Sequence, residues 1–204
     1  MISIITGSLI ISLLHAIIPN HWLPIIAIGK KEQWTLQEVT KVTLISALAH
    51  GVSTVLLGVL LSVLGAKLGR GLTNFTTLIA PVILILMGLL FIYRHHKHKH
   101  FHIDEDIKKK KSKTAIVTAL ATAMFFSPCL EIEAYFLLAG TQAWWLVWFI
   151  SLLYLVITTT GMVLLVRFAF LGLLKLNWHS LEHNAGIITG LTLVATGILS
   201  FFIG

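Results

Sequence analysis

The sequence predicts an all-α polytopic membrane protein, with six transmembrane helices arranged as two inverted three-helix repeats. Three observations predict this fold class. First, 57% of the 204 residues are hydrophobic and only 11% are charged, whereas about a quarter of a typical soluble domain is charged. Second, the apolar residues form runs of about 20, the length that a helix needs to cross a bilayer. Third, several landmark residues recur at an offset of 109 to 110.

Short polar loops divide the apolar sequence into six expected spans. These spans are residues 3–28, 42–65, 74–93, 114–140, 144–166 and 184–203. The N-terminal segment has neither a basic leader nor a small-residue cleavage site, so we expect it to remain as the first span. The chain then divides into a first three-helix repeat at 1–93, a His/Lys-rich loop at 94–113, and a second three-helix repeat at 114–204.

The distribution of Lys and Arg predicts the orientation. If the 94–113 loop is cytoplasmic, 13 of the 15 Lys and Arg residues lie on the cytoplasmic side, and only Lys67 and Arg70 lie outside. Because positive residues concentrate on the cytoplasmic side of membrane proteins, we expect a multi-pass protein of a prokaryotic cytoplasmic membrane with both termini outside. The net charge of +7 therefore marks topology, and we expect no nucleic-acid partner.

The recurring residues predict an internal repeat. The matching pairs are Pro19 with Pro128, His50–Gly51 with Thr160–Gly161, Asn74 with Asn184, and Gly88 with Gly197. Each copy holds three spans, an odd number, so the second copy must enter the membrane in the opposite orientation. Inverted repeats are typical of secondary transporters, whose substrate site lies at the repeat interface near the bilayer midplane.

The first and fourth expected spans each hold a proline that should break the helix. Pro19 removes the N–H group that would bond the His15 carbonyl, and Pro128 does the same for the Met124 carbonyl. An unsatisfied carbonyl in hydrocarbon costs several kcal/mol, so we expect a cavity, water or an ion beside each break. A purely structural kink is the alternative interpretation.

Two histidines flank the first of these prolines. His15 and His21 are six positions apart, which in a regular helix separates their side chains by about 240°. The two imidazoles can therefore converge only if the helix is unwound near Pro19 and Asn20.

A third histidine, His50, lies in the second span, with Ser53 and Thr54 at i+3 and i+4 on the same helix face. Three imidazoles at membrane depth can supply the nitrogen ligands of a borderline transition metal such as Ni, Co, Zn or Cu. Hydrogen bonding between helices is the alternative role for a membrane histidine.

The fourth span carries two carboxylates, Glu131 and Glu133, each costly at membrane depth unless it is paired, protonated or solvated. Helical spacing places Glu131 on the same face as Pro128, and Glu133 on the same face as Cys129. Glu131 is therefore the preferred metal ligand or proton carrier, while Glu133 either takes part in binding or gating or reaches outer water. Cys129 is either a soft ligand or a small buried residue.

The loop between the halves is rich in histidine and lysine. Its histidines resemble a flexible metal-collecting tract, and a plain solvated linker is the alternative interpretation. They are His95, His96, His98, His100 and His102.

At three of these motifs the chain resembles the nickel/cobalt efflux proteins of the NicO family, within the LysE-type transporter superfamily. The motifs are HAIIPNH at 15–21, SALAHGVS at 46–53 and SPC at 127–129. The resemblance extends over most of the chain and implies a six-span, inverted-repeat exporter of divalent metal ions with His15, His21 and His50 at the site.

Two positions depart from the family pattern. Asn20 stands where related proteins often carry Gly or Asp, and Leu130–Glu131 follows the Pro-Cys pair where a second proline is expected. The glutamates favour a harder ion such as Mn or Fe, or a coupling of transport to protons.

These observations predict a transporter and not an enzyme, with a divalent metal ion as its substrate and no resident cofactor. The expected partners are the lipid bilayer and the metal ion, and a homodimer is left open. Metal uptake, export of an organic solute as in other LysE-type proteins, and a haem-binding redox protein are the alternative functions. With Cys129 alone, an intrachain disulfide is excluded.

Overall fold

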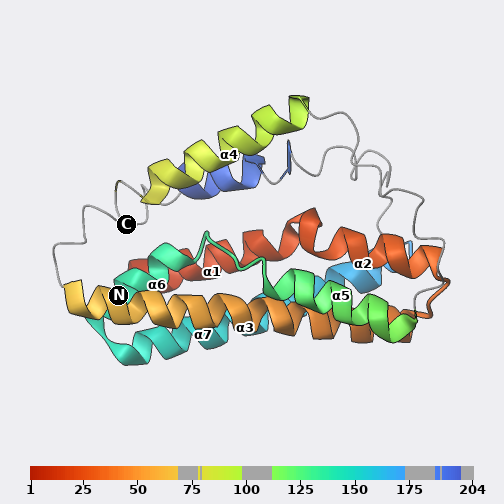
Figure 1. The fold of residues 1–204 in the computed structure, drawn as a ribbon. Coiled ribbons are helices and arrows are strands. Elements are labelled where there is room, and N and C mark those ends of the chain that lie inside the picture. Colours follow the sequence, from red (N-terminus) through yellow and green to blue (C-terminus); the bar gives the residue numbers. More distant parts are fainter. Residues whose placement is uncertain (69–77, 79, 98–111, 173–186, 189, 199–204) are drawn as a thin grey trace.

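The computed structural model describes residues 1–68, 78, 80–97, 112–172, 187–188 and 190–198 (Figure 1). The regular structure of these residues is entirely helical, as the sequence predicts. The helices are α1 (Ile2–Ile17), α2 (Pro19–Lys31), α3 (Leu36–Leu68), α4 (Ala80–Lys97), α5 (Lys113–Phe125), α6 (Glu133–Gln142) and α7 (Trp144–Phe170), and a last helix includes residues 190–198.

Within the described residues, three stretches are long and apolar enough to cross a membrane: Ile2–Lys31, Leu36–Lys67 and Trp144–Phe170. They coincide with the first, second and fifth expected spans. The apolar helices within the third and fourth expected spans, Pro81–Leu90 and Lys113–Phe125, are shorter. Parts of the third and sixth expected spans lie outside the described residues.

Large apolar side chains cover the outward surfaces of the two longest helices. A soluble bundle would place polar residues there, so these surfaces are suited to contact with hydrocarbon. The exposed residues are Leu44, Ile45, Leu48, Val52, Leu56, Leu60 and Leu64 of α3, and Trp148, Phe149, Leu152, Val156, Leu164 and Phe168 of α7.

The break between α1 and α2 is a single residue. Ile18 is extended, with φ −60° and ψ 121°, and Pro19 is the first residue of α2. A residue before proline is forced out of the helical region, whereas proline itself is well tolerated in the first turn of a helix. The sequence therefore dictates both the end of α1 and the start of α2.

The break between α5 and α6 is longer. Residues 126–132 form turns and bends around Pro128, so the expected continuous helical spacing through 114–140 is wrong here. This non-helical segment lies against α3, because the backbone N–H of Cys129 donates a hydrogen bond to the Thr54 hydroxyl at 3.0 Å.

Helix α3 packs against α5, α6 and α7. Its contact with α6 is close because Gly140 has no side chain: a Cβ atom at this position would collide with the backbone of Ser62. The Ser62 hydroxyl also donates a hydrogen bond to the Phe136 carbonyl at 2.7 Å. These contacts between α6 and α3 hold the second half of the chain against the first.

Helix α4 and the last helix form a pair beside the other helices (Figure 1). Glycines allow the close approach: a Cβ atom at Gly88 would lie 2.5 Å from the Gly190 carbonyl oxygen, and one at Gly197 would lie 2.8 Å from the Pro81 carbonyl oxygen. Small residues at such positions are typical of closely packed helices in membranes. Gly186, the partner of Gly190 in a GxxxG pattern, lies outside the described residues.

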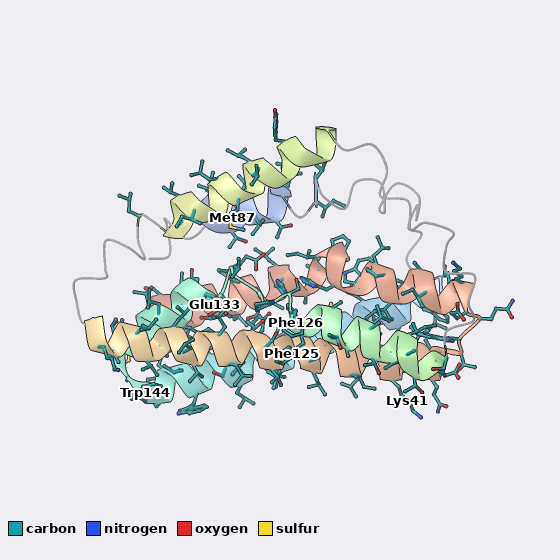
Figure 2. All side chains as sticks on the ribbon, in the orientation of Figure 1. Lys41, Met87, Phe125, Phe126, Glu133 and Trp144 are labelled. Carbon is teal, nitrogen blue, oxygen red and sulfur yellow. The ribbon has the colours of Figure 1, made fainter. Side chains whose placement is uncertain are left out.

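The two broken helices run in opposite directions. In Figure 1, α1 and α2 (red to orange) run from left to right, and α5 and α6 (green to teal) run from right to left. Figure 2 shows Lys41 at one end of the bundle and Trp144 at the other. Lys41 and Trp144 therefore lie at opposite ends of the long axis.

Candidate metal centre

Three histidines converge where the first helix is broken. His15 comes from the end of α1, His21 from the start of α2 and His50 from the middle of α3. The Nε2 atoms of His15 and His50 lie 2.9 Å apart, and the His21 ring centroid lies 4.5 Å and 4.6 Å from the other two rings. The break at Ile18 makes this convergence possible, because a continuous helix would place the His15 and His21 side chains on different faces.

A second group of donors shares one of these histidines. The Cys129 sulfur lies 3.3 Å from Nδ1 of His15 and 2.6 Å from Oε2 of Glu131. The same carboxylate oxygen lies 3.7 Å from Nδ1 of His15. Ligand atoms of His15, Cys129 and Glu131 all fall within 4.8 Å of one another, as do those of the three histidines.

Both groups are enclosed by the fold. His15 and Cys129 are each 2% exposed, His50 is fully buried and Glu131 is 8% exposed, while His21 is partly exposed. Side chains that carry charge or bind metals are rarely placed so deep without a partner. The arrangement therefore concentrates nitrogen, sulfur and oxygen donors in an apolar surrounding.

Hydrogen bonds from several helices hold His50. Its Nδ1 lies 3.4 Å from the Met124 carbonyl oxygen, and its Nε2 lies 3.2 Å from the Tyr154 hydroxyl. Its backbone carbonyl accepts hydrogen bonds from Ser53 and Thr54 at 2.8 and 3.0 Å. These two hydroxyls therefore bond to the backbone of their own helix.

A cavity of about 400 Å³ adjoins the donors. Its polar lining includes His15, His21, Cys129 and Glu131. Met87 lines it from α4 and lies on the side of α4 that faces the other helices (Figure 2). The cavity provides room for an ion beside the buried donors.

The fourth span departs from its predicted geometry. Helical spacing pairs Cys129 with Glu133, but the non-helical segment brings Cys129 to Glu131 instead. Glu133 is only 6% exposed, so the interpretation that it reaches outer water is wrong. Among the described residues, neither Glu133 carboxylate oxygen has a hydrogen-bond partner.

The carbonyls of His15 and Met124, which lose a helical hydrogen bond to proline, were expected to be unsatisfied. Each of them instead accepts another backbone hydrogen bond. The His15 carbonyl accepts the N–H of Ile18 at 3.1 Å, and the Met124 carbonyl accepts the N–H of Ser127 at 3.3 Å. Short turns thus take over the hydrogen bonds that the prolines remove. The cavity expected beside the breaks is present, and both Pro128 and Met124 line it.

Some predicted residues cannot be placed at the site. The Asn20 side chain is outside the described part of the structure, as are the side chains of the five loop histidines; the backbone of His95 and His96 belongs to α4. Residues at the site that were not anticipated include Tyr154, which contacts His50, and Pro24, which lines the cavity from within α2. Pro24 is visible as a further helix breaker, whereas no spacing pattern marks Tyr154.

Comparison with known proteins gives no match to a family model, a curated protein or a solved structure.

Proposed function

We propose that the protein is an integral membrane transporter of divalent transition-metal cations such as Ni, Co or Zn, and that it exports them from the cytoplasm. The observation that carries the proposal is the convergence of His15, His21 and His50 where an apolar helix is broken. Neutral imidazole nitrogens are favourable ligands for borderline divalent metals. Ionisable residues within membrane segments generally mark an ion or substrate pathway.

The proposed architecture has six spans in two inverted repeats. It is supported by the two helices broken beside Pro19 and Pro128 and by their opposite directions in Figure 1. In transporters of this kind, broken helices from the two repeats form the substrate site and the repeats move relative to each other. The ion would bind between the breaks, and Glu131 or a histidine would accept a proton as the ion is released.

The proposed orientation places residues 94–113 in the cytoplasm of a prokaryotic cell and both termini outside. It is supported by Lys30, Lys31 and Lys41, which lie near one end of the bundle, and by Trp144, which lies at the other (Figure 2). Basic residues favour the cytoplasmic side, and tryptophans favour membrane interfaces.

Binding is tested first. Purified protein in which the histidines of 95–102 are replaced is titrated calorimetrically with Ni, Co, Zn, Mn and Fe(II), and its metal content is measured by elemental analysis. We expect binding of a borderline ion, which His15→Ala weakens by about 100-fold or more, because removing a ligand costs more than the 10- to 100-fold typical of an outer contact. Ser8→Ala is the matched control, since this buried hydroxyl donates its hydrogen bond to the Ile4 carbonyl of its own helix.

Transport is tested with the same variants in vesicles that contain a metal-sensitive fluorophore. We expect flux in the parent protein and in Ser8→Ala, and none when His15, His21 and His50 are all replaced by alanine. Binding and flux that survive the triple replacement would refute the site. Flux only in the inward direction would favour uptake, and a Soret band in purified protein would favour a haem protein.

A further inference from the structure

The hydrogen bonds of His50 determine which of its nitrogens carries a proton. The Met124 carbonyl faces Nδ1 of His50 at 3.4 Å, and a carbonyl oxygen can only accept. Nδ1 is therefore assigned as the N–H donor, from its partner and not from an observed hydrogen. In neutral His50 the other nitrogen, Nε2, is then an acceptor.

This assignment determines the tautomer of His15. Its Nε2 lies 2.9 Å from Nε2 of His50, so one of the two atoms must donate. Since Nε2 of His50 accepts, Nε2 of His15 carries the proton, and Nδ1 of neutral His15 presents a lone pair. That lone pair lies on the side of Cys129 and Glu131, at 3.3 and 3.7 Å respectively.

Three electron-pair donors of different chemistry therefore face one another: an imidazole nitrogen, a sulfur and a carboxylate oxygen. Among them the only proton available is that of the thiol, which Cys129 donates to Glu131 at 2.6 Å. All three residues are buried, at 2%, 2% and 8% exposed for His15, Cys129 and Glu131, and all three line the cavity, whereas His50 does not. The site is thus built for a cation that enters from the cavity.

We propose that the transported ion is held by Nδ1 of His15, the thiolate of Cys129 and a carboxylate oxygen of Glu131, while His50 orients His15. This inference rests on the proposed function and names its binding position. The chain Met124 carbonyl–His50–His15 corresponds to the outer hydrogen bonds that commonly fix a metal-bound imidazole. His21 lines the same cavity and contacts His15, so it lies beside this position and is not one of its ligands.

The donor set defines the class of ion. A thiolate favours Zn, Co and Ni over Mn and Mg, which prefer oxygen ligands alone. Two methionines, Met87 and Met124, also line the cavity and add soft sulfur along the approach. As the metal–sulfur bond forms, the S–H bond breaks and the proton leaves through the cavity to solvent. The harder ions Mn and Fe, which the glutamates alone would favour, are therefore not the preferred substrates.

Cobalt spectroscopy tests the position directly, because Co(II) bound to a thiolate gives an intense near-ultraviolet charge-transfer band. Co(II) is titrated into the protein that lacks the 95–102 histidines, and into its Cys129→Ser, His50→Ala and Ser127→Ala variants. Ser127→Ala is the matched control, since it lines the same cavity and removes no proposed ligand. We expect the band in the parent and the control and its loss in Cys129→Ser.

The role of His50 is distinguished by the same band. A positioning residue predicts that His50→Ala retains the sulfur band while Co(II) affinity falls about 10- to 100-fold. Cys129→Ser should weaken Zn binding by a similar or larger factor and leave Mn affinity within about threefold of the parent value. The ratio of Zn affinity to Mn affinity should therefore fall.

The outcomes separate this inference from the proposed function. His21-dependent Co(II) binding without a sulfur band in the parent protein would overturn the Cys129 position and leave metal transport standing. A sulfur band that disappears in His50→Ala while Co(II) remains bound would overturn the positioning role of His50. Absence of both Co(II) binding and metal flux would overturn the proposed function itself.

Discussion

The two helix breaks that meet at the site are built differently. Between α1 and α2 only Ile18 leaves the helical conformation, and the adjacent hydrogen bonds stay local: the Ile18 N–H bonds the His15 carbonyl, and the Trp22 indole N–H bonds the Ile17 carbonyl at 3.1 Å. Between α5 and α6, residues 126–132 leave the helix. Their position depends on another helix, because the Cys129 N–H bonds Thr54 of α3.

The difference shows two ways of bringing donors into an apolar interior. The short break changes the direction in which existing helical side chains point, so that His15 and His21 converge. The long break presents donors from non-helical backbone, which places Cys129 next to Glu131. The first depends on proline, and the second depends on contacts with α3. The proline and the contact with α3 can each be removed by substitution.

The largest effect is expected from Pro19→Ala. Alanine restores the N–H group and removes the restriction on Ile18, so α1 can continue into α2 and His21 turns away from His15 by about 240°. We expect affinity for the transported metal to fall by about 10- to 100-fold, because His21 no longer contacts the ligand His15. Pro128→Ala should cost less than about tenfold, because Thr54 continues to hold the second break.

Calorimetric titration of both variants with the preferred ion measures this contrast. Circular dichroism of Pro19→Ala should show equal or greater helix content, which distinguishes a straightened helix from an unfolded one. Equal losses in the two variants would contradict the distinction between the breaks.

The first break could be predicted from sequence because its cause is local. A proline dictates the conformation of the residue before it, and His15 and His21 follow from their spacing to Pro19. The helical character and the three long apolar segments follow from composition and run length.

The second break could not be predicted in full. Nothing near Pro128 in sequence shows that the helix resumes only at Glu133, because the segment is held by Thr54, 75 residues away. Continuous helical spacing therefore paired Cys129 with the wrong glutamate. Tyr154 was missed for the same reason, since its contact with His50 joins residues 104 positions apart.

An intermediate effect is expected from Thr54→Val, which removes the hydroxyl that holds the second break. The buried N–H of Cys129 then has no acceptor there, at a cost of about 1–3 kcal/mol in the free energy of unfolding. Metal affinity should fall about tenfold as Cys129 moves. Denaturant unfolding in detergent measures the first quantity and calorimetry the second.

Thr54→Ser is the matched variant for this test, because it keeps a hydroxyl at the same position. It should retain the affinity of the parent to within about threefold. A full loss of affinity in Thr54→Ser would show that packing of the methyl group, and not the hydrogen bond, holds the second break.

A smaller effect, of opposite sign, is expected at Glu133. This buried carboxylate has no hydrogen-bond partner among the described residues, so Glu133→Met should raise the free energy of unfolding by about 1–2 kcal/mol. Metal affinity should be unchanged, whereas Glu131→Gln should lower it about tenfold or more. A loss of affinity in Glu133→Met would extend the site to the first residue of α6.

The smallest effect is expected at the end of α5 remote from the site. Lys113 pairs with Glu38, and with the Thr35 contacts this lowers the pKa of that carboxyl from 4.5 to about 2. A depressed pKa stabilises the fold above the unfolded value, so this contribution is present above pH 4.5 and is lost as the pH falls toward 2. Both groups are exposed, so Lys113→Met should lower the melting temperature at pH 7 by about 2 °C or less. The difference between the two proteins should vanish near pH 2, as thermal unfolding across this range would reveal. A larger difference at pH 7 would mean that the pair, and not Thr54 alone, keeps the second broken helix against α3.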